Sequence, residues 1–193
     1  MGFQIAGFAI LFVFYGCYLL KMISQRRKGI KTDQIGKGKV GFVKWIEVTM
    51  KIATYLVPIV EVVSMILNTN SFPKPLRMIG TLVGAIGVTV FIISVLTMQD
   101  SWRAGVSKTD KTELVTGGIY QISRNPAFLG FDLVYIGIIL MFFNWVLLLV
   151  SCFAMIMFHL QIVNVEEVFL QEAFGDAYLS YRKKVCRYIG RKR

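Results

Sequence analysis

The chain has 193 residues, of which 55% are hydrophobic and 17% are charged, and its mean hydropathy is +0.61. One soluble domain of this length cannot bury so much apolar surface, so the composition predicts an all-α polytopic membrane protein. The formal net charge of +11 is divided among three segments. This division argues against nucleic-acid binding and favours contact with anionic lipid, at about 1 kcal/mol for each basic residue near the membrane.

Five segments are apolar enough to cross a membrane. A spanning helix needs roughly 20 apolar residues, because it rises about 1.5 Å per residue through a hydrocarbon core about 30 Å thick. The segments are residues 3–20, 46–67, 78–98, 127–143 and 145–165. The last two meet at Phe143-Asn144-Trp145 and are too long together for one crossing, so we expect them to form a helical hairpin.

The basic residues predict the orientation. Nineteen of the 22 Lys and Arg residues lie between the first and second spans, between the third and fourth, or in the tail. The other three are Lys51, inside the second span, and Lys74 and Arg77, just after it. The positive-inside rule then places the N-terminus outside and the C-terminus in the cytoplasm, which five crossings satisfy and four or six do not. Because no basic leader precedes the first span, we expect it to remain as an anchor.

Cysteine and histidine usage argues against a disulfide framework and against a metal site. The three cysteines are odd in number and far apart, and His159 is the only histidine. We expect His159 to hydrogen-bond between helices or, alternatively, to transfer a proton. Glu61 lies near Pro58 in the second span, where a carboxylate is costly, which predicts a helix bridge, a polar pocket or a proton relay. Residues 28–41, rich in Gly and Lys, resemble a flexible linker.

The connection at residues 99–125 is long for so small a membrane protein, and long connections are usually functional or disordered. Its apolar and aromatic side chains argue against disorder. The Gly117-Gly118 pair permits backbone conformations closed to other residues and the close approach of a ligand. The alternative is a turn followed by a patch at the membrane surface. Arg103 either attracts an anionic headgroup or extends to the membrane interface.

The stretch SRNPAFLGF, residues 123–131, places polar residues directly against an apolar run. Asn125 is a favoured N-cap and Pro126 suits the first turn, so we expect the fourth helix to begin here. The free N–H groups of a helix start favour a bound carboxylate or phosphate, to which Arg124 would add donors. Capping and interfacial anchoring explain these residues equally well. Asp132, one turn beyond Phe128, would orient a substrate or pair with Arg124.

A pair of acidic residues, Glu166 and Glu167, ends the fifth span. The predicted hairpin returns this pair to the membrane face where the fourth helix starts. Adjacent helical residues point about 100° apart, so one glutamate can face a ligand while the other meets a cation. Gly175 is a predicted helix stop. Beyond it, a short C-terminal interfacial helix is expected, with aromatic residues at headgroup level. The residues that recur there at helical spacing are the three aromatics Tyr178, Tyr181 and Tyr188 and the aliphatic Val185.

The run ELVTGGIYQISRNPAFLG, followed after one hairpin by EEVFLQEAFGDAYLSY, resembles the isoprenylcysteine carboxyl methyltransferase and phospholipid methyltransferase family of integral membrane enzymes. The family pattern is Leu-Val-Thr-x-Gly-x-Tyr, Arg-His-Pro-x-Tyr-x-Gly, Glu-Glu-x-x-Leu and Phe-Gly-x-x-Tyr. The resemblance covers about residues 102–187. It implies a methyltransferase that uses S-adenosylmethionine. We therefore expect one membrane domain over residues 1–193, with three helices in residues 1–98 and a cofactor-binding catalytic region in residues 99–193.

The resemblance also implies roles for individual residues. Cofactor binding falls to Leu114, Val115, Gly118 and Tyr120 on the adenosine side, to Asn125, Pro126, Ala127 and Phe128 at the methionine end, and to Glu167. From the residues themselves, independently of the resemblance, we expect catalytic roles for Arg124, Glu166 and Asp132 and substrate binding by Trp102 and Arg103.

The sequence departs from the family pattern at three positions. Asn125 replaces the usual histidine and Phe128 the usual tyrosine, and asparagine cannot exchange a proton near neutral pH. Methyl transfer tolerates this loss, because the sulfonium is already a potent electrophile and the protein mainly aligns the reactants and excludes water. Ile162 occupies the place where eukaryotic carboxyl methyltransferases carry an arginine for the substrate carboxylate.

The methyl acceptor is expected to be lipophilic and to enter from the bilayer, while the cofactor enters from the cytoplasm. Candidates are a prenylated thiol or carboxylate, a phospholipid amine or another hydrophobic small molecule. One alternative function is that of an NADPH-dependent membrane reductase similar to sterol reductases, although so short a chain has little room for a second nucleotide. The other is that of a non-enzymatic membrane protein, which would have no reason to bring a helix start and paired glutamates together.

Overall fold

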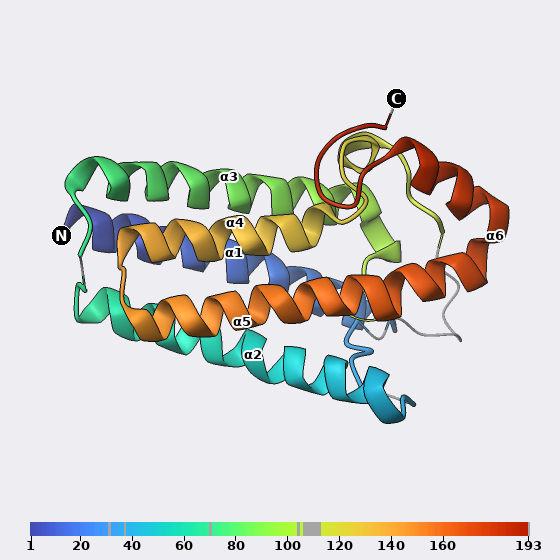
Figure 1. Cartoon of the computed structure of the whole chain (residues 1–193), viewed down its shortest axis with the longest axis horizontal. Helices are drawn as coiled ribbons and strands as arrows, with labels where there is room; N and C mark the ends of the chain where they lie inside the picture. Colours follow the sequence, from blue (N-terminus) through green and yellow to red (C-terminus); the bar gives the residue numbers. More distant parts are fainter. Residues whose placement is uncertain (31, 37, 70, 104, 106–112, 193) are drawn as a thin grey trace.

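The computed structural model describes residues 1–30, 32–36, 38–69, 71–103, 105 and 113–192, and the regular elements of these residues are helices (Figure 1). They are α1 (Gly2–Arg27), α2 (Gly41–Ile66), α3 (Lys74–Met98), the 3-10 turns η1 (Gln99–Ser101) and η2 (Gly118–Gln121), α4 (Pro126–Met141), α5 (Trp145–Gln161), the π-helical turn η3 (Ile162–Glu166) and α6 (Glu167–Lys184).

Four of the helices are long and apolar enough to cross a membrane. They are α1, α2, α3 with η1, and the continuous helix Trp145–Lys184. Helix α4 is also apolar but has only 16 residues. The chain is therefore a polytopic all-α membrane bundle, as the composition predicts. Helix α1 continues past the predicted apolar segment to Arg27, because the Lys, Gln and Arg residues that follow it are good helix formers. Helix α2 begins at Gly41, before the predicted segment.

Helix α4 packs chiefly on α3 through glycines. A Cβ atom added at Gly137 of α4 would lie 2.6 Å from the backbone N of Gly84, and one added at Gly80 would lie 2.7 Å from the carbonyl oxygen of Gly137. Gly87 and Gly130 make similarly close contacts. The two backbones therefore touch, as in other membrane helix pairs with small residues at the interface.

Helix α5 packs chiefly on α2, although it follows α4 directly in the chain (Figure 1). Asn144 fixes the start of α5, because its Oδ1 accepts a hydrogen bond of 2.9 Å from the Leu147 N–H and its Nδ2 donates one of 2.8 Å to the Ser64 hydroxyl. At the other end of the pair, Gln161 donates to the buried Glu47 carboxylate. Helices α4 and α5 are thus held mainly by α3 and α2, respectively, and less by each other.

The two ends of the bundle differ. One end holds the N-terminus and the α2–α3 and α4–α5 connections, and the other holds α6, the C-terminus and the described part of the α3–α4 connection (Figure 1). At this second end, the described part of residues 28–41 is packed. Thr32 is buried and donates to Gln25, which itself donates to the carbonyl of Trp102 over 2.8 Å. The flexible-linker prediction is wrong for residues 32–36, because Thr32, Asp33 and Gly36 hydrogen-bond to side chains of α1 and α2.

Helix α6 departs from the expected interfacial helix. Gly175 breaks the helix as predicted, with φ 49°, but the chain resumes a helical course as far as Lys184 and is extended at Val185. Tyr178 and Tyr181 are 1% and 9% exposed, so these two side chains pack inside the protein, and the level of this helix relative to the headgroups stays a prediction. Both side chains point inward, where the Tyr178 hydroxyl accepts a hydrogen bond from Arg124 and the Tyr181 hydroxyl donates one to the carbonyl of Tyr120.

Candidate active site

The start of α4 and the start of α6 meet through an ion pair. Nη1 of Arg124, two residues before α4, lies 3.0 Å from Oε1 of Glu167, the first residue of α6. Both side chains are less than a tenth exposed. The predicted meeting of the RNP stretch with the acidic pair is confirmed for these two residues.

A second arginine, Arg187 from the C-terminal tail, completes the cluster around this carboxylate. Its Nε donates to Oε1 of Glu167 over 2.8 Å and its Nη2 donates to Oε2 over 3.1 Å. Such a two-pronged contact fixes both the direction and the plane of the carboxylate. One carboxylate thus meets two guanidinium groups, and the cluster of Arg124, Glu167 and Arg187 carries a net charge of +1.

The charges in this cluster reinforce one another. Helix α6 carries six charged residues and lies beyond the apolar part of the Trp145–Lys184 helix. Burial raises the pKa of the Glu167 carboxyl, but the hydrogen bond from Arg187 and the charges of Arg124 and Arg187 lower it more, so its pKa is below the ordinary value. The same hydrogen bond raises the pKa of Arg187. The ionised Glu167 carboxylate therefore stabilises the folded protein at pH values above the ordinary carboxyl pKa. This stabilisation is lost as the pH falls through the lowered pKa of Glu167.

Arg124 is held by an aromatic residue as well. Its Nη1 donates to the Tyr178 hydroxyl over 2.7 Å, and its guanidinium lies 5.9 Å from the centre of that ring. Its Nε is buried and has no hydrogen-bond partner among the described residues. Arg124 therefore keeps one side-chain N–H that the described residues leave unpaired.

The C-terminal tail covers the start of α4. The Arg124 N–H donates to the carbonyl of Cys186 over 3.1 Å, and the Gly190 N–H donates to the carbonyl of Ile122 over 2.8 Å. Asn125 occupies the N-cap position, but its side chain does not cap the helix and its Nδ2 instead donates 3.1 Å to the carbonyl of Arg187. The capping interaction predicted for this side chain is therefore wrong, because the tail competes for it.

The residues predicted to face the adenosine, Leu114, Val115 and Tyr120, belong to a small aromatic cluster apart from the main hydrophobic core. Tyr120 is buried, its hydroxyl shares a 3.0 Å hydrogen bond with Ser94 of α3, and its carbonyl accepts a 2.6 Å bond from the Tyr181 hydroxyl. Burial raises the pKa of Tyr120 above its ordinary value, so the phenol is neutral. Leu114 and Val115 pack against this cluster. Gly118 has φ +57°, and a Cβ there would lie 3.0 Å from Cγ2 of Thr97, so both conformation and space call for glycine.

The remaining α4 residues line the first turn and the next one. Pro126 is buried at the first helical position and Ala127 packs against the main core. The Phe128 ring lies 5.3 Å from that of Phe158 in α5. Oδ1 of Asp132 is buried and has no hydrogen-bond partner among the described residues. Arg124 pairs with Glu167 and not with Asp132, which leaves Asp132 as an acceptor of hydrogen bonds beside the site.

The other predicted site residues lie around this centre. Glu166 is half-buried and interacts electrostatically with Glu47 of α2 and with Tyr120. Trp102 is 4% exposed and packs its ring against Tyr18 and Phe91. Arg103 donates to the carbonyl of Trp102 over 2.9 Å. The substrate-binding roles of Trp102 and Arg103 stay predictions.

Three contributors were missed by the sequence reasoning. Arg187 lies in a basic tail, and nothing in the sequence separates it from the neighbouring bases. Tyr178 and Tyr181 have the spacing of one helix face, a signal equally typical of an interfacial helix.

The predicted hydrogen bond of His159 is present, but with a different kind of partner. Its Nδ1 lies 2.6 Å from the Tyr188 hydroxyl, which belongs to the tail and not to another helix.

Replacing Tyr120 with phenylalanine is expected to destabilise the protein by about 1–3 kcal/mol, because the fully buried Ser94 hydroxyl loses its partner. Thermal unfolding in detergent measures this loss. The exposed Tyr55 of α2 provides the matched control, and Tyr55→Phe should leave the midpoint unchanged. Adding Ser94→Ala to the Tyr120→Phe variant should recover part of the loss. Equal midpoints for Tyr120→Phe and the wild type would contradict this role.

Comparisons with known proteins cover the part of the chain that holds most of this cluster. Residues 76–177, more than half of the chain, match the family described as phospholipid methyltransferase. The match runs from α3 into α6 and so includes Arg124, Asn125 and Glu167, while Arg187 lies outside it.

Two relatives carry the name Protein-S-isoprenylcysteine O-methyltransferase. The one from Schizosaccharomyces pombe is 39% identical over 80 residues, which are 41% of this chain and 34% of the relative. The one from Saccharomyces cerevisiae is 31% identical over 137 residues, which are 69% of this chain and 55% of the relative. The matched part of the chain thus spans between a third and little more than half of the length of these curated relatives.

Proposed function

The chain belongs to the phospholipid methyltransferase family, and from this premise we propose that it transfers the methyl group of S-adenosylmethionine to a lipophilic acceptor in the membrane. The observation that carries the proposal is the 3.0 Å contact between Arg124, at the start of α4, and Glu167, at the start of α6. It joins two distant parts of the matched sequence in one buried polar cluster.

The residues of this cluster fit the chemical groups of the cofactor. The carboxylate of S-adenosylmethionine suits the net charge of +1 of Arg124, Glu167 and Arg187 and the free N–H groups at the start of α4. The unpartnered Nε of Arg124 supplies one more donor. Ribose hydroxyls suit the Glu167 carboxylate, and the adenine ring suits the apolar side of the Tyr120 cluster with Leu114 and Val115.

When bound, the cofactor supplies an electrophilic methyl group on a sulfonium. The residues around it then have to orient the two reactants and exclude water. We assign this role to Arg124, Glu166 and Asp132. In this proposal the unpaired Oδ1 of Asp132 accepts a hydrogen bond from the substrate that is methylated. The Asn125 side chain holds the tail over the start of α4 through its hydrogen bond to the carbonyl of Arg187. Trp102 and Arg103 are assigned to the acceptor side.

The topology is part of the proposal. We infer five crossings with an outer N-terminus, a hairpin of α4 and α5, and a cytoplasmic end that carries the site. Two observations support it. The basic connection before α2 and the basic tail lie at the same end of the bundle (Figure 1). Lys74 and Arg77 at the start of α3 lie at the opposite end.

The acceptor class follows from the relatives and from one departure. Both relatives are named for the O-methylation of isoprenylcysteine, so a prenylated carboxylate is the first candidate, and a prenylated thiol and a phospholipid amine follow it. The departure is Ile162, which is fully buried and apolar. Eukaryotic carboxyl methyltransferases carry at this position an arginine for the substrate carboxylate, so a carboxylate acceptor would lack that partner here.

Incubating the purified protein with methyl-labelled S-adenosylmethionine and either prenylcysteine analogues or membrane lipids tests the proposal. Label should enter the organic phase. Omitting the acceptor provides the control. Cofactor binding without any transfer would favour a non-enzymatic protein, and consumption of NADPH with these lipids would favour the reductase alternative.

Arg187 should act as a positioning residue for Glu167. Replacing it with lysine keeps the positive charge but removes the two-pronged contact, so we expect roughly tenfold weaker binding of S-adenosylmethionine and a larger loss for Arg187→Ala. Calorimetric titration measures both. Arg191 is exposed in the same tail, and Arg191→Lys should bind like the wild type. Wild-type affinity in Arg187→Ala would exclude this role.

A further inference from the structure

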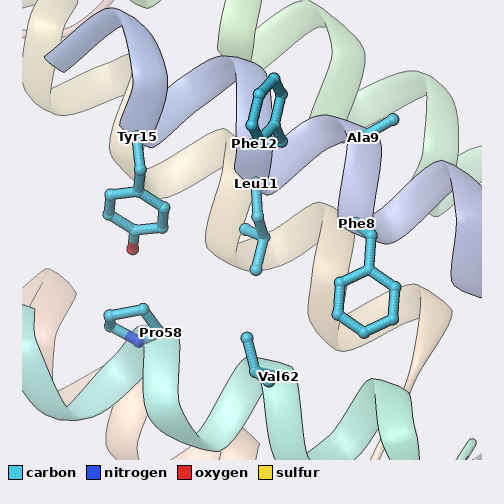
Figure 2. A pocket seen from close by; sticks show the side chains of 7 residues that line it. All are labelled: Phe8, Ala9, Leu11, Phe12, Tyr15, Pro58 and Val62. Carbon is cyan, nitrogen blue, oxygen red and sulfur yellow. The ribbon is translucent and has the colours of Figure 1, made fainter. Parts of the chain in front are cut away.

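A groove lies between α1 and α2 (Figure 2), and the residues that line it include none of Arg124, Glu167 and Arg187. Its volume is about 540 Å³, within the range of about 300–1,000 Å³ that is typical of small-molecule sites. Apolar side chains between Phe8 and Phe12 form one wall, and Pro58 and Val62 form the other. The Tyr15 ring closes one end, and its hydroxyl points across the gap toward α2 (Figure 2).

Next to this groove, the bundle buries polar groups without partners. Both carboxylate oxygens of Glu61 are buried and have no hydrogen-bond partner among the described residues. The buried hydroxyls of Tyr15 and Tyr135 interact with each other but do not reach well-formed hydrogen-bond geometry. Glu61 and Tyr135 are completely buried. Glu61 lies between Pro58 and Val62 on α2, and its carboxylate is near enough to interact electrostatically with both tyrosines. We call these three residues the Glu61 cluster.

The cluster calls for a partner. Leaving a buried donor or acceptor unpaired costs about 1–3 kcal/mol, and native proteins rarely do so. An ionisable residue inside the membrane usually marks a functional site. The rings of Tyr15 and Tyr135 pack against Phe14, Phe131 and Phe158, contacts that phenylalanine would make equally well without burying a hydroxyl.

We propose that the α1–α2 groove binds an uncharged lipophilic alcohol, with its hydrocarbon chain between Phe8 and Pro58 and its hydroxyl at the Glu61 cluster. A hydroxyl can donate to Glu61 and accept from a tyrosine at the same time. A charged headgroup would have to leave water and the membrane interface, which is far more costly. This site is independent of the proposed methyl transfer.

The site is tested with two photoreactive probes that share a twelve-carbon diazirine chain, one ending in a hydroxyl and the other in a methyl group. The full-length protein is reconstituted in phosphatidylcholine nanodiscs and labelled with each probe. Mass spectrometry then maps the label. We expect the alcohol to label peptides with residues 8–12 and 58–62 at least about fivefold more than the alkane, because one hydrogen bond corresponds to about that factor.

Two variants link this preference to the cluster. Tyr15→Phe keeps the ring and Glu61→Gln keeps the shape of the side chain, and each should reduce alcohol labelling toward the alkane level. Tyr55→Phe, which changes an exposed tyrosine of α2, should label like the wild type. Thermal unfolding confirms that each variant is folded. Equal labelling by both probes would mean that the groove holds hydrocarbon only, and an undiminished preference in both cluster variants would place the hydroxyl elsewhere. Either result overturns the proposal.

Discussion

Replacing Glu167 with alanine is expected to destabilise the protein by about 3–5 kcal/mol and to abolish binding of S-adenosylmethionine. The carboxylate is the shared partner of Arg124 and Arg187, and the Arg124 side chain is only 5% exposed. Without Glu167, a buried guanidinium loses its counter-charge, and two positive groups face each other. Thermal unfolding and calorimetric titration measure the two effects.

The control is another carboxylate of α6. Asp176 is exposed, and Asp176→Asn should leave both stability and affinity at wild-type values. Glu167→Gln separates the two effects further, because the amide keeps the volume and part of the hydrogen bonding but removes the charge. It should lose less stability than the alanine variant and still bind the cofactor poorly. If Glu167→Ala unfolds at the wild-type temperature and binds normally, the assignment of this cluster is wrong.

Replacing Gly137 with alanine should be nearly as damaging, although it adds only one methyl group. That methyl carbon would lie 2.6 Å from the backbone N of Gly84, and no flexible side chain stands there to move aside. Helices α3 and α4 would have to separate, at an expected cost of about 1–3 kcal/mol or more. The start of α4 would shift with them, so we also expect weaker cofactor binding. Unfolding midpoints and size-exclusion profiles in detergent report the result.

Gly16 of α1 is the matched control, because an added Cβ there meets no atom within 4 Å. Gly16→Ala should be neutral or slightly stabilising, since alanine is the better helix former. Equal stability of Gly137→Ala and Gly16→Ala would show that α3 and α4 do not pack through their glycines.

The apolar segments and the signals between them predict much of this fold. Runs of about 20 apolar residues locate the long helices, and the Asn125-Pro126 step locates the start of α4. The meeting of Arg124 with Glu167 follows from the chain reversal at Asn144, since a reversal returns the second helix to the level where the first began. These features are local or follow from a single turn.

The rest depends on partners far away in the sequence. Gly80, Gly84 and Gly137 show small-residue spacing, but only the opposing backbone makes that spacing essential. Arg187 looks like any basic tail residue until its contact with Glu167 is known. Tyr178 was expected at the membrane interface and is buried, because the Arg124 guanidinium supplies a partner for its hydroxyl. In each case a tertiary contact overrides a pattern that fits several structures equally well.

Equilibrium binding of S-adenosylmethionine to the purified wild-type protein tests the central claim most directly. S-adenosylmethionine and NADPH are titrated in parallel calorimetric experiments. We expect S-adenosylmethionine to bind and to raise the unfolding temperature, and NADPH to do neither. The same titration on Glu167→Ala should show no binding. An absence of S-adenosylmethionine binding by the folded wild type, or binding that persists undiminished in Glu167→Ala, would contradict the account.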